Sequence, residues 1–108
     1  MPRLANRFHG PAQVSNAAAT KFTVSASELA IIRHIHIQNP SGSAVTFTAS
    51  IGADAAATRI FDAYSIAANS VFDHYPMYVM IAAEIFQAFA GTNNILVLTI
   101  DGDRSVLG

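Results

Sequence analysis

The stretch "LAIIRHIHIQNPSGSAVTFTASI", residues 29–51, decides the fold class of this chain. Its first half has apolar side chains at positions 29, 31, 35 and 37, interrupted by Arg33, and polar ones at even positions from His34 on. Its second half alternates in the same way over residues 45–51. Period-two alternation is typical of a strand with one buried face. The turn-forming cluster "NPSGSA" between the halves therefore predicts an antiparallel hairpin.

Short apolar segments separated by turns continue through the rest of the chain. They predict further strands at residues 21–24, 59–66, 71–75 and 95–102. For residues 77–90, the alanines and Pro76 favour a helix, but a turn at "AAE" favours two short strands, which we prefer because strands surround the segment. About eight short strands predict an all-β fold, a single antiparallel β-sandwich or jelly-roll-like domain.

The two ends of the chain show no sustained alternation. Residues 1–20 contain Gly, Pro, Asn and small residues, and they predict an extended N-terminal arm in front of a domain at residues 21–108. At the other end, "DGD" at 101–103 predicts a turn after the last strand, followed by a short tail.

The composition predicts association with other protein subunits. Of 108 residues, 52% are hydrophobic and only 12% are charged, and the mean hydropathy is +0.36. A domain of this size has too much surface to hide so many apolar side chains, so we expect a homo-oligomer. The net charge of −1, with scattered basic residues, argues against binding to nucleic acid. We expect no signal peptide and no membrane contact, because the start lacks an apolar core and the longest apolar run is short.

His34 and His36 form the pattern closest to a metal site. Residues two apart on a strand point to the same face, so both imidazoles could reach one ion. The cupin family places such a pair on a strand with a Glu a few residues later, but here "IQNPS" follows. His74, Asp73 or His9 could supply a third ligand, yet no spacing requires it. We therefore predict a polar strand face without metal or cofactor.

Catalytic motifs are missing from the sequence. No G-x-S-x-G turn presents a serine nucleophile. The neighbours in "DHY" at 73–75 would point to opposite faces of a strand. "DGD" lacks the later ligands and the closing Glu of a calcium loop. We predict no catalytic residue, and hence no enzyme.

Two groups of residues are candidates for contacts with other molecules. Phe72, Tyr75 and Tyr78 surround Pro76 and fit either a half-wet contact patch or packing at the edge of a sheet. His34 and His36 join them as the candidate contact surface. In the predicted arm, the residues that would reach a neighbouring subunit are Arg3, Arg7 and Phe8.

The run "KFTVSASELAIIRHIHIQNPSGSAVTFTASIGADAAATRIFDAYSIAANSVFD", with "AAEIFQAFAG" and "LTIDGD", resembles a group of small virion proteins of tailed bacteriophages. The resemblance covers residues 21–102. It implies a β-sandwich on the virion, made in the host cytoplasm, as a minor tail component or a head-decorating protein. It also implies other virion proteins as partners and no catalytic residues.

Two alternatives stay open beside this interpretation. One is a carbohydrate- or receptor-binding sandwich that meets a host-surface glycan through Phe72, Tyr75 and Tyr78. The other is a cupin-like metalloenzyme that uses His34 and His36.

Overall fold

The computed structural model describes the backbone of residues 3–106 and the side chains of residues 4–106. Within this part of the chain there are nine strands and no helix, and accordingly no helix long and apolar enough to cross a membrane. The strands are β1 (Arg3–Gln13), β2 (Ala19–Thr23), β3 (Glu28–Asn39), β4 (Val45–Ile51), β5 (Arg59–Ile66), β6 (Ser70–His74), β7 (Tyr78–Met80), β8 (Ile85–Ala90) and β9 (Val97–Val106).

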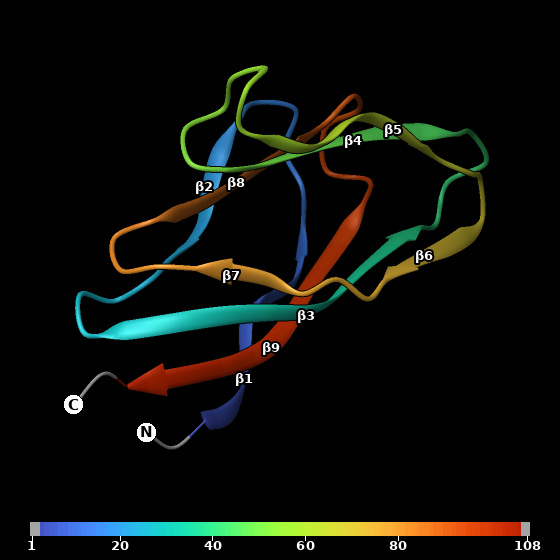
Figure 1. Ribbon diagram of the computed structural model, residues 1–108. Helices are drawn as coiled ribbons and strands as arrows, with labels where there is room; N and C mark the ends of the chain where they lie inside the picture. Colours follow the sequence, from blue (N-terminus) through green and yellow to red (C-terminus); the bar gives the residue numbers. More distant parts are fainter. Residues whose placement is uncertain (1–2, 107–108) are drawn as a thin grey trace.

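The strands form two antiparallel sheets that pack face to face (Figure 1). In the first sheet the order is β1-β9-β3-β6. β7 pairs with β3 as well, at residues 30–32, whereas β6 pairs with residues 35–39. In the second sheet the order is β2-β8-β4-β5. This arrangement confirms the predicted all-β sandwich. The ambiguous residues 77–90 contain β7 and β8 with a turn between them, which confirms the preference for two short strands.

The predicted hairpin of residues 29–51 is wrong, because its two strands belong to different sheets. β3 pairs with β6, β7 and β9, whereas β4 pairs with β5 and β8. The connection crosses between the sheets, and the fully buried Asn39 fixes it: Nδ2 donates to the carbonyls of Ser43 at 2.9 Å and Ile66 at 3.0 Å. The alternation of apolar and polar residues indicates only that each strand has a buried face. It is the same whether two strands pair edge to edge or pack face to face.

The core lies between the inward faces of the two sheets. Ile35, Ile37 and Ile100 from the first sheet are fully buried and belong to one cluster with Phe47 and Phe86 from the second. Along the side where β5 faces β6, a group of aromatic rings closes the sandwich. These rings are Phe61, Tyr64, Phe72, His74 and Tyr78.

The alternation of β3 changes phase at a β-bulge. Ala30 and Ile32 are buried in the first half, but Ile35 and Ile37 are buried in the second. The register with β9 shifts between Ile32 and His34, so Arg33 is the additional residue. Leu29 and Ile31 therefore lie on the outer face, contrary to the continuous odd-numbered face that the sequence predicted. A bulge moves all later side chains to the opposite parity.

The described residues near both ends of the chain lie in strands where the sequence predicted an arm and a tail. Residues 3–13, expected in a free arm, form β1 and pair with β9 from Arg3–Ser105 to Gln13–Val97. Two register shifts within this pairing remove any steady alternation from β1. The expected turn at 101–103 and residues 104–106 of the expected tail lie inside β9, where Gly102 faces Ile32 on one side and Asn6 on the other. Residues 107–108 of that tail lie outside the described residues.

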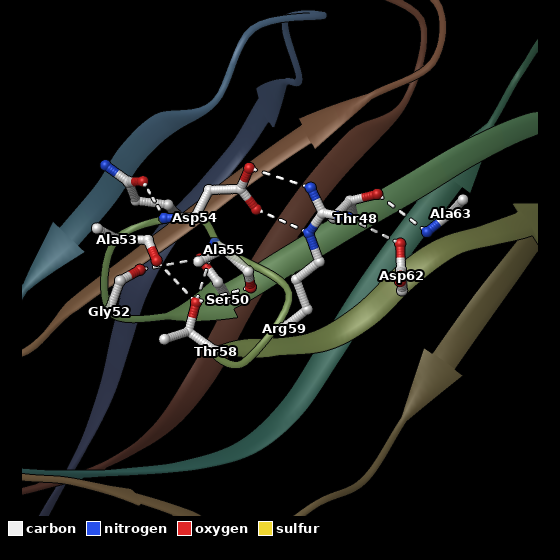
Figure 2. A network of polar contacts seen from close by, with 11 residues as sticks. Thr48, Ser50, Gly52, Ala53, Asp54, Ala55, Thr58, Arg59, Asp62 and Ala63 are labelled. Atoms are coloured by element: carbon white, nitrogen blue, oxygen red, sulfur yellow. Dashed lines mark hydrogen bonds and ion pairs between the residues drawn. The ribbon is translucent and has the colours of Figure 1, made fainter.

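Arg59 holds the connection between β4 and β5 in place (Figure 2). Its guanidinium donates from Nε to Asp54 Oδ1 at 2.9 Å and from Nη2 to Asp54 Oδ2 at 3.2 Å. Nη1 donates to Asp62 Oδ1 at 3.0 Å. Thr58 Oγ1 donates to the Ala53 carbonyl at 2.7 Å within the same loop. These hydrogen bonds from Arg59 hold the pKa of Asp54 below its ordinary value.

We expect Arg59→Gln to raise the pKa of Asp54 toward its ordinary value, because the charged bidentate donor is lost. A carboxyl group with a lowered pKa stabilises the fold above its ordinary pKa, near 3.9, and this contribution disappears as the pH falls through the lowered value. The difference in unfolding free energy between wild type and variant should thus shrink below about pH 4. Carboxyl NMR titration and denaturant melts at several pH values measure both effects. An unchanged Asp54 titration in the variant would contradict the role of Arg59.

Candidate functional site

His34 and His36 lie side by side on the outer face of the first sheet. The bulge at Arg33 puts Ile35 and Ile37 in the core, so the even-numbered residues that follow it point away from the second sheet. Both histidine side chains are partly exposed, by 28% and 35%. Their shared face is as the sequence predicted.

Asp73 completes a cluster with the two histidines. It lies on β6 directly opposite His36 in the antiparallel pairing. Its Oδ1 is 2.8 Å from His34 Nε2 and 2.5 Å from His36 Nδ1, so each ring nitrogen donates to this oxygen when it carries a proton. The hydrogen bond from His36, and then that from His34, lowers the pKa of Asp73. The three residues form a two-imidazole, one-carboxylate cluster.

Two further side chains surround His34. The Tyr75 ring stacks on the His34 ring, with the centroids 4.5 Å apart and the planes within 6° of each other. On the other side, Asp101 of β9 is the cross-strand neighbour of His34, and its Oδ2 lies 3.8 Å from His34 Nδ1. Tyr75 and Asp101 thus restrict the orientation of the His34 ring.

The structure divides the predicted contact surface between two faces. His34, His36 and Tyr75 are together on the outer face. Phe72 and Tyr78 instead pack against the core, where Phe72 lies 6.1 Å from the Phe61 ring. Phe72 alternates in direction with its neighbours on β6, so it cannot share a face with Asp73 and Tyr75. Of the two original interpretations, edge packing describes Phe72 and Tyr78.

The residues of the predicted inter-subunit arm belong to the domain's own sheet. The Phe8 ring stacks on Phe22 with centroids 4.9 Å apart, which buries it partly against the core. Arg7 is exposed on β1, opposite Asp101 of β9. The side chain of Arg3 lies outside the described residues.

An exposed apolar row accompanies the cluster on the same edge of the sheet. From residue 71 in β6 to residue 81 just after β7, every second side chain is exposed to solvent. All of these side chains except that of Asp73 are apolar or aromatic. The members of this apolar row are Val71, Tyr75, Met77, Val79 and Ile81, which are 55–73% exposed. Val79 is paired with Ile31 of β3, so the row extends onto the outer face of the sheet. Sequence reasoning identified Tyr75 alone among them.

No protein-family model and no curated protein matches this sequence. Among solved structures, the fold is similar to that of a chain in the structure of infectious bursal disease virus, Gx strain. The TM-score is 0.53, with 15% identity over 99% of this chain. This fold occurs in a virus. A chain in the structure of the Gt strain gives a TM-score of 0.41 and 7% identity over 95% of this chain.

This chain spans about a third of the length of the viral chains it resembles, 32% and 29% respectively. At such low identity the likeness to the Gx-strain chain concerns the arrangement of strands. It adds to the confirmation of the sandwich fold.

The sequence named Asp73 as one of three possible third ligands, with His74 and His9, but it could not single out Asp73 as the partner of the two histidines. It belongs to "DHY", but its position beside His36 depends on the register between β3 and β6, which are far apart in the chain. The sequence offered one indication for choosing between Asp73 and His74: the alternation of "VFDHY" places these two residues on opposite faces of a strand.

Proposed function

We propose that this protein is a non-catalytic structural module of a bacteriophage virion, located on the tail or on the capsid surface. The observation that carries the proposal is the apolar row on one edge of a small sandwich. Exposed apolar patches on a small domain mark sites of protein association. The sandwich fold found in a virus structure, together with the resemblance to small phage proteins, supports a place in the particle.

A second copy of this chain is the partner that best fits the apolar row. Its members carry no charge, and Asp73, the charged residue that lies between Val71 and Tyr75, is hydrogen-bonded to two histidines. Two copies can therefore bring the row together without opposing like charges. Other virion proteins would then attach to the oligomer. A glycan-binding platform has less support, because Phe72 and Tyr78 pack inward.

We expect the purified protein to be a defined oligomer by light scattering after gel filtration, and Met77→Asp to shift it toward monomer. The substitution places a charge at a side chain that is 65% exposed in the apolar row. Burial of an unpaired charge in an interface costs several kcal/mol, so association should weaken at least tenfold, about 1.4 kcal/mol or more.

Ala56→Asp is the matched control, because it introduces the same charge at an exposed residue of the β4–β5 connection. It should leave the oligomer unchanged, and circular dichroism should report the same fold for both variants. A wild-type monomer at high concentration, or an oligomer insensitive to Met77→Asp, would rule out this interface.

A further inference from the structure

We propose that His34, His36 and Asp73 bind a divalent transition-metal ion, with Zn²⁺ as the best match. Each residue offers one ligand atom, and the three atoms lie within 4.8 Å of one another. They come from two neighbouring strands, β3 and β6, whose hydrogen-bonded register fixes their spacing. The site does not depend on the assembly role proposed above.

The geometry needs only a small adjustment to accept an ion. Zinc binds imidazole nitrogen and carboxylate oxygen at about 2.0–2.2 Å, which puts tetrahedral ligand atoms about 3.4 Å apart. Asp73 Oδ1 lies 2.8 Å and 2.5 Å from the two ring nitrogens. Binding therefore requires the Asp73 carboxylate to move back by roughly 1 Å, and the two imidazoles, whose ligand nitrogens lie within 4.8 Å of each other, to turn toward one another. Asp73 is on the exposed face, so no core side chain has to move.

The set of donors selects the class of metal. Two imidazoles and one carboxylate suit Zn²⁺ and its neighbours among the first-row metals, whereas Ca²⁺ and Mg²⁺ prefer oxygen ligands. The chain has no cysteine, so thiolate does not compete. Three protein ligands leave a coordination position on the solvent side, which water or a side chain of another protein can fill.

The surroundings of His34 match those of a metal-binding histidine. Such residues usually present their second ring nitrogen to a carboxylate, which orients the ring and raises its basicity. Here His34 Nε2 faces Asp73 while Nδ1 faces Asp101 Oδ2, 3.8 Å away. Tyr75 covers one face of the same ring. A plain polar strand face would need neither feature.

The test is titration of metal-free protein with Zn²⁺ by calorimetry, with His36→Ala and Asp73→Asn beside the wild type. We expect one ion per chain for the wild type. Loss of a direct ligand should weaken binding at least tenfold, since even loss of an outer partner costs about 10–100-fold. Asp62→Asn, which removes the same charge from an exposed carboxylate on β5, is the matched control and should bind like wild type.

A second readout uses the unchanged protein, so it does not depend on the variants folding. Nitrogen NMR of the imidazoles should show Zn²⁺-induced shifts at His34 and His36 but not at His9 and His74. Cobalt(II) in place of zinc should give the visible absorption of a tetrahedral site. Absence of stoichiometric binding, equal binding by Asp73→Asn, or shifts confined to His9 or His74 would overturn the proposal.

Discussion

Gly102→Ala is expected to destabilise the fold by about 3 kcal/mol, which is at the upper end of the cost of overpacking a well-packed site. A Cβ atom at this position would lie 1.9 Å from the carbonyl oxygen of Ile31 and 3.1 Å from the backbone nitrogen of Arg33. Both are backbone atoms of β3 in the middle of the sheet, so no flexible side chain can yield. The strands would have to separate at the bulge.

The measurement is chemical denaturation of Gly102→Ala and of Gly42→Ala as the matched control. Within the part of the chain that the structure describes, no heavy atom outside the neighbouring residues lies within 4 Å of a Cβ at position 42. The control should therefore stay within about 0.5 kcal/mol of wild type. We also expect the NMR signals of His34 to change in Gly102→Ala, because the bulge fixes its direction. Equal stability of the two variants would mean that β3 and β9 are not packed this closely.

Phe47→Ala is expected to cost about 4 kcal/mol, within the range of 3–5 kcal/mol for the loss of a buried phenylalanine. Phe47 has no exposed surface and is among the largest fully buried side chains. It lies in the core cluster between the sheets and packs against the Phe61 ring, 5.7 Å away and edge-on. A domain of this size has a total stability of about 5–15 kcal/mol, so a substantial part of it would be lost.

Thermal or urea unfolding followed by circular dichroism measures this loss. Leu4→Ala is the control, because it removes an apolar side chain from a residue that is 45% exposed and lies outside the apolar row. We expect the control to cost less than about 1 kcal/mol. A loss below about 2 kcal/mol for Phe47→Ala would show that the core collapses around the missing ring.

Most strand positions were predictable because they depend on local alternation. The predicted strand at residues 59–66 coincides with β5, and residues 45–51 coincide with β4. The polar face of His34 and His36 was also correct. By contrast, β1 was not predicted and its residues were assigned to the arm. Its two register shifts interrupt the alternation by which a strand is recognised in a sequence.

The sequence by itself determined that this chain forms a β-sandwich and that His34 and His36 share one face. Both follow from the order of apolar and polar residues along single strands. Only the tertiary structure decided that β3 and β4 lie in separate sheets and that the bulge at Arg33 reverses the buried face. It also brought Asp73 to the histidines. The reason is physical: pairing and register arise from contacts between distant segments, and alternation within one strand is compatible with several partners.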